Sequence, residues 1–333
     1  MSQFASSLRE AARFIQDHDR FLVVNHVNPD GDATGSLLAM GWLLRQLSKQ
    51  AVLVNEGMTP EKFMFLPGAS EILNASEALP QKYDAVITCD CGDKSRVGRV
   101  EHWFAEGCEL LNIDHHPTND HFGTSNLIRT DAAATCEILY DLVCFMQLTV
   151  SPEMATCLYA GLLTDTGGFR YSNTTPHLMQ AASALLSYGV QPGILAERLL
   201  ETITAGHLKL LRKVLQTMEF SENNRVVSMA VTRCDMEEAG ANDEDTEGLV
   251  NYGRNVEGVE VGVLYKEKNA GEVKVSMRSR SIIDVAAIAK SLDGGGHVRA
   301  SGCTIKGGIE EARQIISDKL REAFQAAEES SYD

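Results

Sequence analysis

Cys108-Glu109-Leu110-Leu111-Asn112-Ile113-Asp114-His115-His116 is a largely apolar run that ends in one carboxylate and two imidazoles, at a point where a strand should end. Three other apolar segments also lead into acidic residues: Asp30 and Asp32, then Asp90, then Asp165. The carboxyl ends of parallel strands lie at one edge of an α/β sheet, so residues far apart in sequence can form one site there. The sequence therefore predicts a parallel sheet with a polar site at the ends of its strands.

Short apolar runs alternate with helical spacing in the first part of the chain. The predicted strands are 21–24, 51–54, 85–89 and 109–113. The predicted helices are 8–15, 33–47 and 100–105, followed by a helical region at 134–145, 152–163, 176–187 and 192–200. This pattern is typical of an α/β protein with a doubly wound parallel sheet.

A second α/β region follows a long predicted helix at 205–220. Its predicted strands are 225–231, 259–266 and 272–278, and its predicted helices are 284–291 and 310–327. The last two strands are close enough to pair, which indicates a smaller, mixed sheet. We therefore expect a sheet domain at 1–200, a helical linker at 201–222 and a second domain at 223–333.

Charge limits the partners of the chain. The 333 residues carry a formal net charge of -16, which argues against a protein that holds long duplex nucleic acid through clustered Lys and Arg. Between 264 and 306, however, eight basic residues stand against four acidic ones. A small anionic ligand is the partner that this distribution favours.

The cellular location is inferred from apolar segments and cysteines. Residues 1–19 lack the continuous apolar core of a signal peptide, and no apolar run reaches membrane-spanning length. Most of the eight cysteines lie inside helical or strand patterns, which fits reduced core thiols. Cys89 and Cys91 flank Asp90, but strand alternation turns both away from it, so they are interpreted as buried thiols rather than ligands. We expect a cytoplasmic protein without membrane contact.

Acidic and imidazole side chains at these segment ends form a candidate metal site. Pro29 and Gly31 make the backbone turn, which lets three nearby side chains converge. The candidate ligands are His26, Asp30, Asp32, Asp90, His115 and Asp165. Four carboxylates and two imidazoles suit two divalent ions that share a bridging carboxylate, with manganese favoured and magnesium, cobalt or iron possible. Taken singly, an Asp-Gly-Asp turn, a helix-capping Asp and two exposed histidines would each have an ordinary structural explanation.

Together these motifs resemble a known superfamily. His26-Val27-Asn28-Pro29-Asp30-Gly31-Asp32-Ala33, Asp90, Asp114-His115-His116 and Thr164-Asp165-Thr166-Gly167 resemble the four ordered motifs of the DHH phosphoesterases. Gly294-Gly295-Gly296-His297-Val298-Arg299-Ala300-Ser301-Gly302 resembles the substrate-binding motif of the associated DHHA1 domain. The two-domain layout is most similar to the branch of nano-RNases and pAp phosphatases, where pAp is 3'-phosphoadenosine 5'-phosphate.

The resemblance implies a role for each predicted ligand: His26 and Asp30 bind one metal ion, Asp32, His115 and Asp165 bind the other, and Asp90 bridges them. Asp114 is expected to orient His115 or its loop, since a ligating imidazole needs its other nitrogen hydrogen-bonded. His116 is expected to face the substrate phosphate.

The glycine motif is the predicted substrate-binding element of the second domain. Gly294, Gly295 and Gly296 let the backbone approach a phosphate or sugar closely. The side chains expected to help are His297, Arg299 and Ser301, with Arg278 and Arg280 as secondary candidates that could equally be solvated charges. We expect the active site in a cleft between the domains, closed by a hinge near 200–222.

The expected function is hydrolysis of short single-stranded oligoribonucleotides to nucleoside 5'-monophosphates, and of pAp to AMP, by a metal-activated water. Several alternatives stay open: a soluble phosphodiesterase for cyclic or linear dinucleotides, a RecJ-like single-strand DNA exonuclease, and a non-catalytic nucleotide sensor. A family II inorganic pyrophosphatase is disfavoured by the glycine motif. The resemblance also suggests a homodimer.

Overall fold

The computed structural model describes residues 3–78, 80–268 and 271–329. The chain divides into two compact units, Met1–Thr202 and Ile203–Asp333. Helix α7 (Ala205–Gln216), which lies inside the predicted linker, belongs to the second unit.

The first unit is built on a parallel sheet of six strands. Its strands are β1 (Arg20–Asn25), β2 (Gln50–Asn55), β3 (Leu73–Asn74), β4 (Tyr83–Cys89), β5 (Phe104–Asp114) and β6 (Ser125–Ile128), in the spatial order β3-β2-β1-β4-β5-β6. The chain runs outward in both directions from β1 and β4, so the order reverses between these two central strands. Ligand sites of open α/β sheets lie outside the carboxyl ends of the strands at this reversal.

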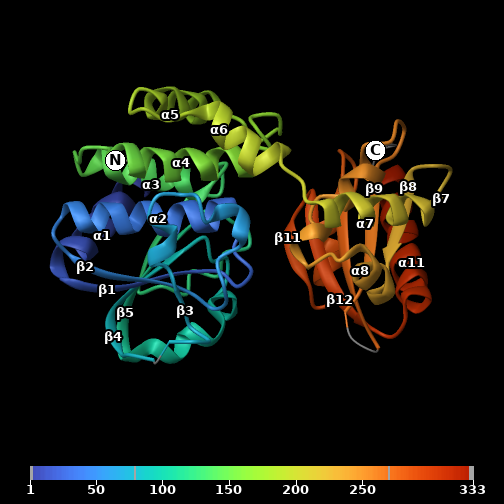
Figure 1. The fold of residues 1–333 in the computed structure, drawn as a ribbon, viewed down its shortest axis with the longest axis horizontal. Coiled ribbons are helices and arrows are strands. Elements are labelled where there is room, and N and C mark those ends of the chain that lie inside the picture. Colours follow the sequence, from blue (N-terminus) through green and yellow to red (C-terminus); the bar gives the residue numbers. More distant parts are fainter. Residues whose placement is uncertain (1–2, 79, 269–270, 330–333) are drawn as a thin grey trace. The chain divides into compact units, whose positions relative to one another are not determined.

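Helices cover one face of this sheet, as Figure 1 shows for α1, α2 and α4, with α5 beyond them. Their bounds are α1 (Gln3–Asp17), α2 (Gly31–Gln46), α3 (Thr135–Phe145), α4 (Pro152–Asp165) and α5 (Pro176–Leu186). Because side chains alternate along a strand, Val23 and Ile87 pack into this helical core, while Leu22 and Val86 pack on the other face. That other face is covered by the 3-10 segment η3 (Lys94–Trp103).

Short elements complete the first unit. They are the 3-10 turns η1 (Glu61–Phe63) and η2 (Ala69–Glu71), helix α6 (Pro192–Ala196) and the π-helical turn η4 (Glu197–Glu201). The helix predicted at 192–200 is therefore α-helical only as far as Ala196.

The second unit contains a mixed sheet in the order β11-β12-β10-β9-β8-β7. Its strands are β7 (Glu219–Ser221), β8 (Val226–Val231), β9 (Val261–Glu267), β10 (Glu272–Ser279), β11 (Gly295–His297) and β12 (Ala300–Lys306). Only β8 and β9 pair in parallel, and the predicted pairing of the strands at 259–266 and 272–278 is confirmed. The fold class predicted from the sequence, a parallel-sheet α/β unit followed by a mixed-sheet α/β unit, is confirmed.

Helices cover both faces of the second sheet. One face packs against α7, α8 (Arg233–Ala239) and α9 (Leu249–Arg254), and the other packs against α10 (Val285–Lys290) and α11 (Ile309–Glu329). The turn η5 (Glu244–Thr246) lies within the acidic stretch between α8 and α9. Among the described residues, no helix is long and apolar enough to cross a membrane.

Two predicted helices were placed wrongly. Residues 94–103 form a 3-10 segment, interrupted by the positive φ of Gly98, and Phe104 already pairs with Tyr83 as part of β5. The helix predicted at 205–220 ends at Gln216, because the Thr217 hydroxyl donates to Ala230 of β8 and the chain turns into β7. Both errors come from long-range pairing that local periodicity does not report.

Candidate metal centre

His26, Asp30 and Asp32 lie at the junction between β1 and α2. Asp30 caps the helix, because its Oδ1 accepts hydrogen bonds from the N–H groups of Asp32 at 3.1 Å and Ala33 at 3.0 Å. Asp32 is fully buried in the first turn. The helix predicted at 33–47 therefore begins two residues earlier than expected, because α2 starts at Gly31.

Asp90 follows β4 and lies at the centre of the cluster. Its backbone has a positive φ of 62°, and its N–H donates to the carbonyl of Ile113 in the neighbouring strand. Its carboxylate is almost completely buried between two imidazoles: Oδ2 lies 3.4 Å from His26 Nε2, and Oδ1 lies 3.5 Å from His115 Nε2. A non-glycine residue held in this backbone region at a polar site is typical of a functional position.

His115 brings the cluster together from β5. Its Nδ1 contacts the carbonyl of Ala132 at 3.3 Å, so its Nε2 faces the carboxylates. That nitrogen lies 4.0 Å from Asp32 and 3.5 Å from Asp165. Asp165 was expected at the end of a strand, but this was wrong, because it is the last residue of helix α4. The run before it belongs to the helix predicted at 152–163, which continues two residues further than expected, to Asp165.

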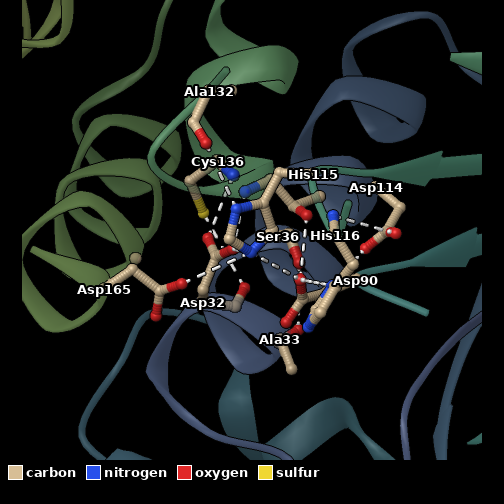
Figure 2. A network of polar contacts seen from close by, with 12 residues as sticks. Asp32, Ala33, Ser36, Asp90, Asp114, His115, His116, Ala132, Cys136 and Asp165 are labelled. Atoms are coloured by element: carbon tan, nitrogen blue, oxygen red, sulfur yellow. Dashed lines mark hydrogen bonds and ion pairs between the residues drawn. The ribbon is translucent and has the colours of Figure 1, made fainter. Parts of the chain in front are cut away.

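Figure 2 shows Asp32, Asp90, His115 and Asp165 pointing toward one another. Donor atoms of two groups lie within 4.8 Å of one another: His26, Asp30 and Asp90 in one, and Asp32, Asp90 and His115 in the other. Asp90 belongs to both groups. Asp165 adjoins the second through its contact with His115.

The electrostatics of the cluster fit divalent cations. In the described part of the chain, the ion pairs of Asp32, Asp90 and Asp165 are all with histidines. Burial and then the charge of Asp90 raise the pKa of Asp32 to about 7, and burial with the charge of Asp32 raises the pKa of Asp165 well above its usual range. The protein alone thus leaves more buried negative charge than its histidines neutralise, which cations would relieve.

Contacts with histidines lower the pKa of Asp90. Burial raises the pKa of Asp90, but the hydrogen bond from His26 and the charges of His116 and His115 outweigh it and hold the pKa below its usual range. Burial likewise lowers the pKa of His26, while Asp90 and Asp30 raise it on balance.

Asp114 holds His116. Its Oδ1 lies 2.7 Å from His116 Nδ1, its Oδ2 accepts the His116 N–H at 3.1 Å, and Asn119 donates to Oδ2 at 2.6 Å. Burial lowers the pKa of His116, but Asp114 and Asp90 raise it to about 9. Asp114 was expected to orient either His115 or the loop. The structure shows contacts with the loop and His116, because the Ala132 carbonyl occupies the second nitrogen of His115.

The glycine motif forms a tight pair of strands in the second unit. A Cβ on Gly294 would lie 2.3 Å from the Gly302 carbonyl oxygen, and one on Gly296, at φ 135°, would lie 2.5 Å from the Ala300 oxygen. These two glycines are therefore required by the approach of β11 to β12. Around Gly295, apart from its chain neighbours, no atom of the described residues lies within 4 Å of such a Cβ, so its backbone leaves open space for a ligand.

Side chains of the same motif make several contacts within the second unit. The Arg299 guanidinium donates to the carbonyls of Ser281 and Ile283, and the buried Ser301 hydroxyl donates to Val285 O at 2.6 Å. Arg278 donates to the carbonyl of Met277, a contact with its own strand. The carbonyls that accept from Arg280 are those of Arg254 and Val256, each at 3.3 Å, and half-buried His297 lies in β11.

Comparison with known proteins identifies the family. Residues 20–162 match the DHH family, N-terminal domain, and residues 223–329 match the DHHA1 domain. A curated protein of Thermus thermophilus is 37% identical over 92% of this chain and 90% of its own length. The chain belongs to the DHH family. DHH phosphoesterases use divalent metals, and the donor groups of this DHH chain suit such ions.

Relatives of this DHH chain carry a specific description. The Thermus thermophilus protein is named bifunctional oligoribonuclease and PAP phosphatase NrnA, and so is a Bacillus subtilis protein, 29% identical over 93% of this chain and 96% of its own. Among solved structures, an exopolyphosphatase-related protein from Bacteroides fragilis matches with a TM-score of 0.89 and 25% identity, covering 97% of this chain and 98% of its own.

One group of contacts was not predicted from the sequence of this DHH chain. Thr135 and Cys136, at the start of α3, bind the carboxylates of Asp32 and Asp90. No local pattern could have predicted these contacts. The alanine-rich stretch before Thr135 has no cap residue, and the acceptors lie 45 to 104 residues away in the sequence.

Proposed function

We propose that this chain is a two-metal phosphoesterase that hydrolyses short single-stranded oligoribonucleotides to nucleoside 5'-monophosphates and pAp to AMP. The observation that carries the proposal is Asp90, whose two carboxylate oxygens face the two donor groups. The names of relatives at 37% and 29% identity over nearly the whole chain support the substrate class.

The residue roles are part of the proposal. His26 and Asp30 would hold one divalent ion, Asp32, His115 and Asp165 the other, and Asp90 both; manganese suits this mixed set of oxygen and nitrogen donors. When bound, two such ions would lower the pKa of a water so that hydroxide can attack the phosphorus, and they would stabilise the negative charge on the phosphoryl group. The chain holds their ligands in place through the Asp30 cap and the contact between His115 and Ala132.

His116 would act on the substrate itself. Asp114 holds its ring through Nδ1, so a proton for the phosphoryl oxygen or the leaving oxygen would come from Nε2. The ring is mostly buried beside Asp90, at 3.7 Å, which places it next to the proposed metals.

The second unit would bind the nucleotide. Its candidates are the backbone of Gly294, Gly295 and Gly296 with the side chains of His297, Arg299, Ser301 and Arg278. Arg299 and Ser301 would also hold the surrounding loop through their backbone contacts. We further propose that Arg280 has a supporting role in substrate binding and that the protein is cytoplasmic and dimeric.

Parallel assays of one purified protein test the function. With Mn²⁺ present, pAp, a linear dinucleotide, a cyclic dinucleotide, a pentaribonucleotide, single-stranded DNA and pyrophosphate are compared by initial rate. The proposal expects pAp and the short RNAs to be hydrolysed fastest, with 5'-monophosphates as products. A marked preference for the cyclic dinucleotide, for DNA or for pyrophosphate would contradict it, as would tight binding without any turnover.

A further inference from the structure

The start of α3 contacts the candidate metal centre at several points. The Thr135 hydroxyl donates to Asp90 Oδ1 at 2.9 Å. The N–H groups of Thr135 and Cys136 donate to the two carboxylate oxygens of Asp32, at 2.6 Å and 3.0 Å. With the Ala132 carbonyl on His115, one short segment touches three of the six proposed ligands.

This arrangement depends on how α3 is capped. Its N-cap, Ala134, has no side chain that could accept the first N–H groups of the helix. Asp32 from α2 accepts them instead, and a carboxylate is stabilised at this end of a helix. The same contact that caps α3 therefore fixes the direction of the Asp32 carboxylate.

Glu137 fixes the segment from the other side. It is buried, and its Oε2 accepts the N–H of Ala133 at 2.8 Å while its Oε1 pairs with Arg129 at 2.6 Å. Arg129 also pairs with Asp141 in the next turn of α3, and its own N–H donates to the carbonyl of Asp114. Glu137 thus ties the loop before α3 to the end of β5, from which His115 extends.

We propose that Thr135 and Glu137 are positioning residues of the metal centre: Thr135 orients the bridging carboxylate of Asp90, and Glu137 holds the segment that carries Thr135. This inference rests on the proposed function, in that it takes Asp32, Asp90 and His115 as metal ligands. Neither residue contacts substrate. Removal of such an outer hydrogen bond lowers metal affinity by about 10- to 100-fold in known metal sites.

The test measures Mn²⁺ binding without substrate, by the electron paramagnetic resonance signal of free Mn²⁺ during titration. Thr135→Val has nearly the same shape but no hydroxyl, and should bind Mn²⁺ about 10- to 100-fold more weakly than wild type. Thr135→Ser restores the hydroxyl and should restore the affinity. Thr88→Val is the matched control, because Thr88 is equally buried but its hydroxyl donates to Asn112 rather than to a proposed ligand.

A second pair of variants tests the segment independently, in case Thr135→Val does not fold. Glu137→Gln loses the charge that pairs with Arg129 and should weaken Mn²⁺ binding. Asp141→Asn also removes a charge that pairs with Arg129, but Asp141 contacts Arg129 and His177 rather than the Ala133 N–H, so this variant should bind Mn²⁺ like wild type.

Separate outcomes overturn the inference and the function. Wild-type affinity in both Thr135→Val and Glu137→Gln overturns the positioning role, whatever the substrate, and so does a Thr135→Ser variant as weak as Thr135→Val. A wild-type protein that binds two Mn²⁺ ions but hydrolyses none of the tested phosphoesters overturns the proposed function alone.

Discussion

Asp90 is the residue on which the proposed chemistry depends. Its positive φ and its backbone bond to Ile113 set its carboxylate between His26 and His115. Asparagine also tolerates this backbone region, so an Asp90→Asn change removes the charge with little change of backbone. The residue therefore allows charge and fold to be tested separately.

We expect Asp90→Asn to reduce the activity toward pAp by more than about 100-fold. Loss of a residue that only hydrogen-bonds a metal ligand costs up to about 100-fold, and a bridging ligand would serve both ions directly. Circular dichroism should show a folded protein. The matched control is Asp84→Asn, at an exposed position of the same strand, which should keep wild-type turnover. Substantial activity of purified Asp90→Asn with Mn²⁺ would rule out the bridging role.

Glu260 is a second residue whose charge matters, here for the stability of the second unit. It is buried, and its Oε1 accepts the N–H groups of Ser281 and Ile283 at 2.9 and 3.0 Å. Arg299 donates to the carbonyls of the same two residues. Burial raises the pKa of Glu260, but these backbone N–H groups outweigh it and lower the pKa on balance.

Glu260→Gln should therefore lower the free energy of unfolding by about 1.5–3 kcal/mol at pH 7, the usual contribution of hydrogen bonds to a charged group. A carboxylate with a lowered folded pKa stabilises above its unfolded pKa, about 4.3, and loses this effect as the pH falls through the folded pKa. Urea unfolding of both proteins from pH 7 downward measures the difference. A difference that stays constant below pH 4 would contradict the assignment.

At the scale of elements, the contact between α2 and α4 brings Asp32 and Asp165 into one site. The helices approach closely because glycines face each other across the contact. A Cβ on Gly161 would lie 2.5 Å from Asp32 Oδ1, and one on Gly35 would lie 2.6 Å from the carbonyl oxygen of Cys157. Larger residues at either position would separate the helices and, with them, the two carboxylates.

Gly35→Ala should destabilise the protein by about 1–3 kcal/mol through overpacking against a backbone atom, although alanine favours helices by about 1 kcal/mol. Gly193→Ala in helix α6 provides the control, because outside its own helix no atom of the described residues lies within 4 Å of that Cβ. Urea midpoints should fall for Gly35→Ala and stay or rise for Gly193→Ala. Equal midpoints for the two variants would show that the close contact contributes little.

At the scale of the whole molecule, all six proposed metal ligands lie in the first unit, Met1–Thr202. A ligand that binds only the folded state stabilises it by about 2.7 kcal/mol at 100 times its Kd. Stabilisation by bound Mn²⁺ should be confined to the first unit when no substrate is present.

Hydrogen exchange measured by mass spectrometry checks this. With Mn²⁺ in place of a chelator, amide exchange should slow in α2, in α3 and at the ends of β4 and β5, and stay unchanged in β8, β9 and β10. Addition of a non-hydrolysable pAp analogue should extend protection to the glycine motif in β11. Protection of the second unit by Mn²⁺ alone would contradict the assignment of every ligand to the first unit.

The sequence by itself determined the features that follow from local patterns. Apolar runs predicted the central strands β1, β2, β4, β5, β8, β9 and β10, but not the shorter β3, β6, β7 and β11 or strand β12. The polar residues after the first of these runs predicted His26, Asp90 and His115 at one edge, because parallel strands end together. The DHH and DHHA1 motifs then indicated phosphoester chemistry, which the comparisons support.

Only the tertiary structure decided how these residues are supported. It brought Asp165, at the end of α4, to His115 and paired Asp114 with His116. It also brought Thr135 to Asp90 across 45 residues of sequence, and to Asp32 across 103. Periodicity reports which face of an element is buried, but not which distant backbone group will meet it. The proposed ligands of the candidate centre could therefore be predicted from the sequence, whereas the hydrogen bonds that orient them depend on how α2, α3 and α4 pack.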